Sequence, residues 1–279
     1  MWSSLLSVAG LLIAGAILVV AWLRLRTSDR QNRELKALVE QKSRQIQDVE
    51  EELKQLSLID PLTKLRNRRF LREMIDVEIA RVHRIHGDLL RDSGSVDREK
   101  ASLGFMLLDI DDLKQVNDSF GHEVGDALIQ HVATRLQEAV RDVDAVVRWG
   151  GEEFLVVCKE VGRKSLHDLA LRLALHIKTN PLELSNGEVM VSRTCSIGFS
   201  LYPFVSSIVD LFSYEEVINF ADNALQIAKS NGRDLVVGIV GEEGAIGATD
   251  KDTLKQDLTE GMEQGQLKLI APEGVELSL

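Results

Sequence analysis

The sequence has little positive charge, only two cysteines and no charged side chain before Arg24. Its 33 lysines and arginines are outnumbered by 44 aspartates and glutamates, which gives a formal net charge of −11. Sequence-independent binding to nucleic acid needs a basic surface that displaces counterions from phosphates, so the composition argues against nucleic acid as a partner. Cys158 and Cys195 lie in apolar, strand-like runs without metal-ligand spacing. We therefore expect reduced cysteines packed in a core.

An apolar segment occupies residues 1–23 and is long enough to span a bilayer. The positive charges Arg24, Arg26 and Arg30 follow this segment, whereas a cleaved secretory signal carries its basic residues in front. The positive-inside rule then places the amino terminus outside and the rest of the chain in the cytoplasm. We expect a single-pass transmembrane helix. A buried core helix is the alternative, and it is disfavoured because the segment is apolar around its whole circumference.

The charged segment 24–58 contains a repeating apolar pattern with alternating steps of four and three. Its members are Leu35, Val39, Ile46, Val49, Leu53 and Leu56, with Lys42 at one polar position of the seam. This heptad pattern predicts a parallel coiled coil that brings two copies of the chain together, with Lys42 weakening it or setting its register. A single solvated helix is the alternative.

The following region, 59–240, alternates strand-like runs with helical periodicity. Asp60-Pro61 ends the preceding helix, because proline lacks a backbone N–H and restrains its predecessor. We expect helices over 67–85, 124–140, 166–177 and 214–230, a charged loop over 87–101, strands over 103–108, 146–149, 154–158 and 235–240, and one or two strands over 189–200. This alternation predicts an α/β fold with helices packed on a sheet.

Two acidic clusters at strand ends are the main chemical signal. Asp109 follows the apolar strand, and Glu152 and Glu153 lie in a glycine turn between the two strands of a predicted hairpin. Mg²⁺ prefers carboxylates together with phosphate oxygens and waters, so two such strand ends placed together make a metal–nucleotide site. An acidic turn on a solvated hairpin is the alternative when spacing alone is considered.

Several motifs in a fixed order decide between these alternatives. They are DPLTKLRNRRF at 60–70, LLDIDDLKQVNDSFGHEVGDALI at 107–129, RWGGEEF at 148–154, CSIGFS at 195–200 and ADNALQIAKSNGRD at 221–234. Together they resemble the GGDEF family of diguanylate cyclases over roughly 58–240. The resemblance implies a nucleotidyl-cyclase fold, with a ferredoxin-like, palm-like sheet and flanking helices. From this resemblance, together with the apolar segment 1–23 and the positive charges after it, we expect a single-pass protein of the bacterial inner membrane with the catalytic domain in the cytoplasm.

The resemblance also implies a reaction and its catalytic residues. Asp109, the Ile110 carbonyl and Glu152 match the ligands of Mg²⁺, for which Mn²⁺ can substitute, and Glu153 supports them. Glu152 matches the residue that assists deprotonation of a ribose 3′-hydroxyl, which attacks the α-phosphorus of a second GTP. The products are cyclic di-GMP and two pyrophosphates. Each protomer of a homodimer holds one GTP.

Further positions match the residues that bind substrate and product. The guanine-binding matches are Asn117 and Asp126, with His122 in the adjoining turn, and the phosphate matches are Lys114, Lys229 and Arg233. An acidic acceptor suits guanine, because the N1–H and N2–H₂ groups of guanine both donate. The pair Arg141 and Asp144 matches an inhibitory product site, so the resemblance implies feedback inhibition by cyclic di-GMP. By itself such a pair is usually a solvated ion pair.

Some positions depart from the family pattern. Lys64 replaces a usual glycine, Gln226 stands where tyrosine is common, and Asp234 replaces an asparagine, while the charged loop 87–101 looks like an insertion. None of these departures removes a metal, guanine or phosphate residue.

The acidic segment 241–279 contains one predicted helical stretch around 252–264. Its part 252–279 faintly resembles the first helix and strand of an EAL phosphodiesterase domain but stops before any catalytic motif. We expect a disordered or regulatory tail there, without phosphodiesterase activity. Two other function classes remain open: a non-catalytic cyclic di-GMP receptor that uses Arg141 and Asp144, and a membrane scaffold that recruits partners.

Overall fold

The computed structural model describes residues 57–91, 101–184, 189–247 and 249–278, and in the amino-terminal part residues 22, 26, 35–36, 38–46 and 49. The chain divides into two compact units, 1–57 and 58–279, each of which is described by itself. The predicted transmembrane helix lies outside the described residues except for Trp22. Within the described part of the chain, no helix has both the length and the apolar character needed to cross a membrane.

The described residues of the amino-terminal unit are helical. Four members of the predicted heptad seam are strongly exposed there, namely Leu35 at 59%, Val39 at 57%, Ile46 at 58% and Val49 at 54%. Exposed apolar side chains at this spacing agree with an unpaired copy of a coiled-coil helix. Pairing itself stays a prediction.

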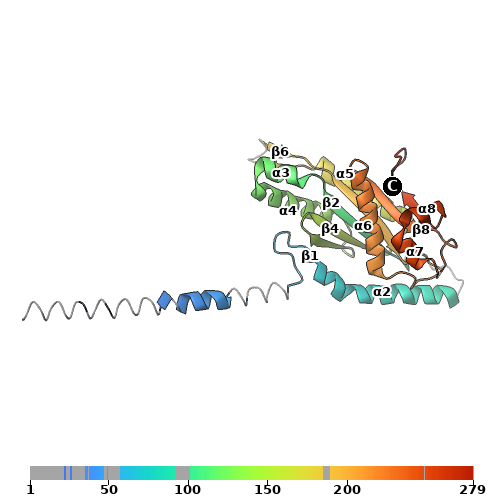
Figure 1. The fold of residues 1–279 in the computed structure, drawn as a ribbon, viewed down its shortest axis with the longest axis horizontal. Helices are drawn as coiled ribbons and strands as arrows, with labels where there is room; N and C mark the ends of the chain where they lie inside the picture. Colours follow the sequence, from blue (N-terminus) through green and yellow to red (C-terminus); the bar gives the residue numbers. More distant parts are fainter. Residues whose placement is uncertain are drawn as a thin grey trace, which may run out of the picture. The chain divides into compact units, whose positions relative to one another are not determined.

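The second unit is built on a seven-stranded mixed sheet in the order β1-β3-β4-β2-β7-β8-β9 (Figure 1). Its strands are β1 (Arg66–Asn67), β2 (Leu103–Ile110), β3 (Ala145–Gly150), β4 (Glu153–Lys159), β7 (Cys195–Tyr202), β8 (Val236–Gly241) and β9 (Leu267–Ile270). A separate hairpin pairs β5 (Leu182–Leu184) with β6 (Val189–Val191). The β1–β3 and β7–β8 pairs are parallel, and the other pairs in the main sheet are antiparallel.

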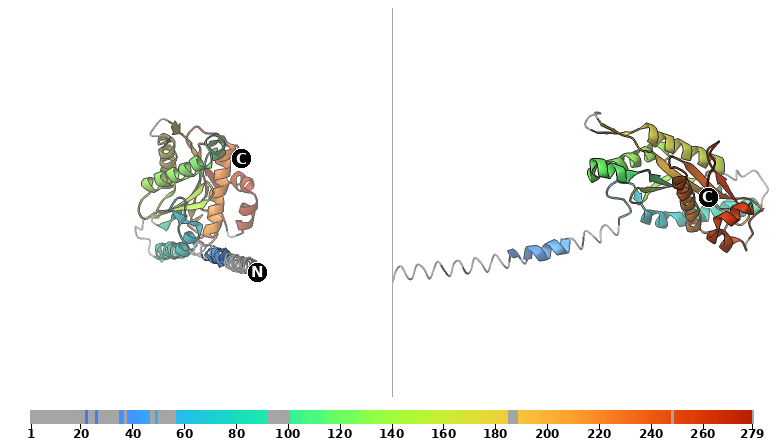
Figure 2. Two further views of the ribbon diagram at one scale, coloured as in Figure 1. Left: turned by 90° about the vertical axis from the view of Figure 1, so that its left-hand side faces the viewer. Right: turned by 45° about the horizontal axis from the view of Figure 1, so that its top comes forward.

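Helices cover both faces of the sheet (Figure 2). They are α2 (Arg68–Arg91), α3 (Leu113–Phe120), α4 (His122–Ala139), α5 (Arg163–Thr179), α6 (Tyr214–Ser230), α7 (Lys251–Gln256) and α8 (Leu258–Glu263). Because side chains alternate along a strand, β2 sends Met106 and Leu108 to the core under α3, α4 and α5, and Phe105 and Leu107 to the core under α2 and α6. Burial on both faces explains the continuous apolar run of β2.

Most of the expected elements are present, and the predicted α/β layering is confirmed. The charged loop expected at 87–101 is wrong at its start, because α2 continues through Gly87 to Arg91. A glycine inside a helix costs about 1 kcal/mol relative to alanine. Tertiary contacts offset this cost, since Val82 is fully buried and the buried His86 ring contacts the Ala101 carbonyl at 2.9 Å. The short helix α3 was not expected.

The acidic carboxyl-terminal segment is folded, so the expected disorder is wrong for residues 249–278, while the helical stretch expected around 252–264 is present as α7 and α8. Strand β9 extends the sheet by pairing with β8, and Leu254 and Leu267 are buried against the core of α2 and α6. A few apolar residues at helical and strand spacing are enough to fix the segment, because the edge of β8 offers both unpaired backbone groups and an apolar face.

The crossing of β7 and α6 brings two backbones into close contact. A Cβ at Gly198 would lie 2.1 Å from the Ala221 carbonyl oxygen and 2.2 Å from the Leu225 nitrogen. Both are backbone atoms of α6, which cannot rotate away as a side chain can. Any residue larger than glycine therefore forces the helix off the sheet.

We expect Gly198→Ala to lower the free energy of unfolding by about 3 kcal/mol or more, because overpacking here moves backbone. Urea unfolding followed by circular dichroism measures this. The control is Gly150→Ala, where the new methyl group meets no atom within 4 Å. A Gly198→Ala protein as stable as the control would contradict this account of the crossing.

Candidate active site

The sequence-predicted acidic residues meet at one end of the sheet. Asp109 near the end of β2 lies directly opposite Glu153 at the start of β4. The Ile110 N–H donates to the Glu152 carbonyl at 3.4 Å, and Gly151 makes the turn with a φ of 47°. Antiparallel pairing thus brings together Asp109, Ile110 and both glutamates of the turn.

The carboxylates at this end crowd one another. Asp109 is only 6% exposed, and its Oδ2 lies 2.8 Å from the Lys229 ammonium of α6. Burial, followed by repulsion from Asp109, raises the pKa of both Glu152 and Glu153. Burial also raises the pKa of Asp109, although Lys229 acts against this. One ammonium group therefore compensates this negative charge incompletely.

Arg148 braces the glycine turn, a role that sequence reasoning did not assign. Its Nη2 and Nε donate to the Gly151 carbonyl at 2.7 and 3.1 Å, and its Nη1 pairs with Asp60 at 2.9 Å. Burial works against ionisation of Asp60, but hydrogen bonds from Thr63 and the Arg148 guanidinium hold the pKa of Asp60 below its ordinary value. The opening motif and the signature turn are thus joined through one arginine.

Asp111 is a second structural residue that sequence reasoning missed. It is 3% exposed and accepts hydrogen bonds from Thr194 Oγ1 and Ser196 Oγ, each at 2.7 Å. It also accepts from the Asp234 N–H at 3.1 Å. Asp111 therefore ties β2 to β7 and to the loop after α6. The available signal was the presence of two further acids, Asp111 and Asp112, directly after the predicted metal ligands Asp109 and Ile110.

The predicted phosphate residues differ in position. Lys229 lies in the last turn of α6 beside Asp109, and Arg233 lies in the loop that follows, with its Nε 3.6 Å from Asp112 Oδ1. Lys114 is exposed on α3, and no contact brings it to Asp109 among the described side chains. The structure thus brings Lys229 to Asp109 in the acidic cluster, whereas Arg233 lies near Asp112, three residues after Asp109.

The predicted guanine-binding residues lie on the packed pair α3 and α4. A Cβ at Gly125 would come 1.9 Å from Asn117 Oδ1, so the Asn117 side chain lies against Gly125. Asp126 follows Gly125 directly and is exposed, and His122 is the exposed first residue of α4. Asn117 therefore lies at the contact between the two helices, and Asp126 is the exposed neighbour in sequence of the glycine that Asn117 packs against.

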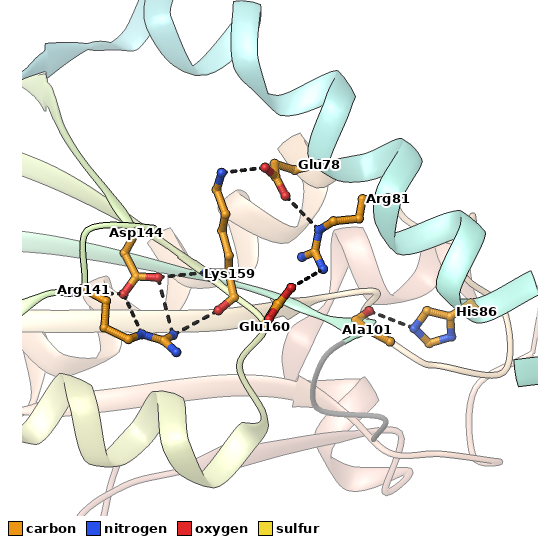
Figure 3. A network of polar contacts seen from close by, with 8 residues as sticks. All are labelled: Glu78, Arg81, His86, Ala101, Arg141, Asp144, Lys159 and Glu160. Carbon is orange, nitrogen blue, oxygen red and sulfur yellow. Dashed lines mark hydrogen bonds and ion pairs between the residues drawn. The ribbon is translucent and has the colours of Figure 1, made fainter. Parts of the chain in front are cut away.

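Arg141 and Asp144 lie beside Lys159 (Figure 3), which is the last residue of β4 and thus at the opposite end of the strand from Glu153. The Asp144 side chain is 0% exposed and accepts from Arg141 Nε at 3.2 Å and from the Lys159 N–H at 3.0 Å. Arg141 Nη2 donates in turn to the Lys159 carbonyl at 3.0 Å. The pair is thus a fixed, partly buried structure, in contrast to the usual solvated ion pair.

The donor set at the acidic end fits a hard divalent cation. No group of three or more histidine, cysteine, aspartate or glutamate side chains converges to bind a metal ion in the part of the chain that the structure describes. Mg²⁺ commonly takes one or two carboxylates and completes its shell with phosphate oxygens and water. Asp109, Glu152 and the Ile110 carbonyl supply such a set, and burial together with neighbouring carboxylates raises the pKa of both side chains, which a bound cation would oppose.

Residues 57–235 match the family model described as diguanylate cyclase, GGDEF domain. The chain belongs to the GGDEF family. The response regulator PleD of Caulobacter vibrioides is 32% identical to it over 184 residues, which cover 66% of this chain and 36% of PleD. The diguanylate cyclase DgcP of Pseudomonas aeruginosa is 35% identical over 213 residues, which cover 72% of this chain and 27% of DgcP. The GGDEF chain thus matches about a third of the length of these relatives.

Solved structures agree with this GGDEF fold. The diguanylate cyclase SiaD from Pseudomonas aeruginosa, in complex with its activator SiaC, aligns with a TM-score of 0.51 at 26% identity and covers 81% of this chain and 78% of SiaD. A sensory box/GGDEF family protein from Caulobacter crescentus aligns with a TM-score of 0.50 at 32% identity, over 63% of this chain and 100% of that protein.

We expect Glu152→Gln to stabilise the GGDEF domain at neutral pH without metal by less than about 1 kcal/mol. A carboxyl group whose pKa is raised by folding contributes stability at low pH that is lost as pH rises through the folded pKa, so removing its charge relieves a cost. Thermal melts with and without Mg²⁺ test this. Mg²⁺ should raise the melting temperature of the wild type more than that of the variant. A variant that melts lower without metal would contradict the electrostatic account.

Proposed function

We propose that this GGDEF protein is a diguanylate cyclase that condenses two GTP molecules into cyclic di-GMP. The observation that carries the proposal is the convergence of Asp109, Glu152 and Glu153 with the Lys229 ammonium at one sheet end. A non-catalytic cyclic di-GMP receptor has no use for these closely spaced carboxylates, whose mutual repulsion destabilises the domain when no metal is bound. Relatives named diguanylate cyclase support the same reaction.

Each residue of the site has a chemical task in this reaction. Asp109, Glu152 and the Ile110 carbonyl hold Mg²⁺, or Mn²⁺ in its place, and Glu153 supports them. When bound, the metal neutralises triphosphate charge and stabilises the charge that develops as pyrophosphate leaves. Glu152, with its raised pKa, accepts the proton of the attacking ribose 3′-hydroxyl. Lys229 neutralises phosphate oxygens.

The remaining substrate contacts select GTP. The Asp126 carboxylate accepts from the N1–H and N2–H₂ groups of guanine, an edge that adenine lacks, and Asn117 binds beside it on α3. His122 lies at the start of the same helix. Lys114 and Arg233 contact the oxygens of the triphosphate through charge-assisted hydrogen bonds.

Conversion of GTP to cyclic di-GMP, followed by chromatography, tests the proposal on the full chain and on the compact unit 58–279. We expect Mg²⁺-dependent product, and at least 10³-fold less from Glu152→Ala, because it loses a metal ligand and the proton acceptor together. Glu183→Ala, at an exposed position on β5, is the matched control. Full turnover by Glu152→Ala would refute the mechanism. Cyclic di-GMP binding without any GTP turnover would favour the receptor alternative.

A cleft beside Arg141 and Asp144 supports product inhibition. It has a volume of about 510 Å³, and its charged lining is Lys64, Arg66, Arg141 and Lys159 against Asp142 and Asp144. Four cations and two carboxylates leave a formal excess of two positive charges, in a chain whose net charge is −11. Cyclic di-GMP carries two phosphodiester charges and flat guanines that offer edges to a guanidinium group, so its charge and shape suit this cleft.

Replacing Arg141 tests the product site. We expect Arg141→Ala to raise the cyclic di-GMP concentration for half-inhibition by at least about tenfold, because a charge-assisted contact contributes about 1.5–3 kcal/mol. Initial rates with added cyclic di-GMP measure the change, and calorimetry measures direct binding. Arg84→Ala, an exposed arginine on α2, serves as the control. Unchanged inhibition in Arg141→Ala would remove this site from the proposal.

We propose in addition that residues 1–23 anchor the protein in the bacterial inner membrane with the domain in the cytoplasm, and that the linker pairs two copies. The exposed seam residues of the linker helix support the pairing, since each protomer holds one GTP and two must meet.

The paired substitution Val39→Lys and Ile46→Lys puts charges into this seam. We expect it to reduce turnover by the full chain about tenfold at low protein concentration, while the protein stays in the membrane fraction. Rates across a dilution series, together with cell fractionation, measure both properties. The matched control is Lys36→Ala with Glu40→Ala, outside the seam. Full-rate turnover in the seam variant at every dilution would contradict linker-driven pairing, and recovery of the wild type in the soluble fraction would contradict the anchor.

A further inference from the structure

Residues 271–278 lead back to the carboxyl end of α6, which is distant from them in the sequence. Asn231 and Ser278 share three hydrogen bonds: Ser278 N–H and Oγ donate to Asn231 Oδ1 at 2.8 and 2.9 Å, and Asn231 Nδ2 donates to the Ser278 carbonyl at 2.8 Å. The partly buried Leu277 packs beside this contact region, against the core under α2 and α6. The segment lies beyond the family match, which ends at residue 235.

Asn231 begins the loop that presents two of the predicted phosphate contacts. It caps the carboxyl end of α6, where its N–H and Nδ2 both donate to the Ile227 carbonyl, at 3.1 and 2.9 Å. Lys229 is two residues before it and Arg233 two residues after it. A contact that fixes Asn231 therefore fixes the backbone between the two cations.

The loop after Asn231 needs external support because its backbone is strained. Gly232, Arg233 and Asp234 have φ values of 108°, 63° and 49°, so two non-glycine residues adopt the left-handed region in succession. The Asp234 N–H is held by Asp111 at 3.1 Å. Ser278 secures the opposite end of the same loop through Asn231.

From this geometry we infer that segment 271–278 is a latch on the phosphate-binding loop, and that Asn231 is a positioning residue for Lys229 and Arg233. The inference rests on the proposed use of these two cations to hold the triphosphate of GTP. The latch consists of exposed hydrogen bonds, which contribute little to global stability. A small displacement of the side chains that hold a substrate can nevertheless have a large effect on the reaction.

A graded series in the full chain tests the latch. Ser278→Ala removes only the hydroxyl bond, whereas Ser278→Pro also removes the backbone N–H donor. We expect the KM for GTP to rise about twofold in the alanine variant and about tenfold in the proline variant, with kcat changed less and the melting temperature unchanged within about 2 °C. Glu276→Ala, an exposed position on the same segment, should match the wild type.

Two measurements distinguish an effect of the latch on GTP binding from a general effect on the protein. Calorimetric binding of GTP with Mg²⁺ should weaken in the order wild type, Ser278→Ala, Ser278→Pro, while cyclic di-GMP inhibition at the remote Arg141 cleft stays unchanged. An unchanged KM and GTP affinity in Ser278→Pro would overturn the latch. So would a melting temperature that falls together with kcat, because that result means general destabilisation.

The latch and the proposed activity fail in different ways. Wild-type protein that binds GTP but forms no product would refute the activity and leave the latch decided by the binding series. Wild-type protein that does not bind GTP at all would overturn both.

Discussion

The antiparallel pairing of β2 with β4 is the constraint on which the rest of the site depends. It sets Asp109 opposite Glu153 and places the Ile110 N–H against the Glu152 carbonyl. A register shift of one residue would send Asp109 to the other face of the sheet, away from α6 and Lys229. Burial of both faces of β2 under helices excludes such a shift, so the hydrophobic core holds the acidic cluster in place.

The same pairing also separates two charged regions. At the Glu153 end of β4, carboxylates dominate, and Lys229 forms a direct ion pair with Asp109. At the Lys159 end, cations outnumber carboxylates around the cleft of Arg141. Lys159 is itself paired with Glu78 of α2 at 2.5 Å, which joins α2 to this end of the sheet (Figure 3). The two ends of β4 thus have opposite charge: the Glu153 end suits a cation and the Lys159 end suits an anion. A ligand bound at one end need not displace a ligand bound at the other.

Sequence reasoning was accurate where a residue's role follows from local chemistry. The apolar run of β2, the hairpin around the glycine turn and the whole of α6 follow from periodicity, and the two buried free cysteines were expected from their apolar surroundings. It failed where a distant partner decides. Gly87 is helical because α2 packs on the sheet, and the acidic tail is ordered because β8 has an open edge.

The order and spacing of its motifs, by themselves, determined that this chain has a GGDEF fold with two acidic strand ends and a glycine turn between strands. The family was indicated by the resemblance of the ordered motifs, whereas the α/β class, the acidic strand ends and the glycine turn follow from local preferences, which depend on neighbours within a few residues. Only the tertiary structure decided that Asp111 and Arg148 brace the site, that Asp144 is buried beneath Arg141, and that Ser278 reaches Asn231. Those contacts join residues that are distant in sequence or depend on burial, and no local pattern specifies which buried polar group will meet which partner.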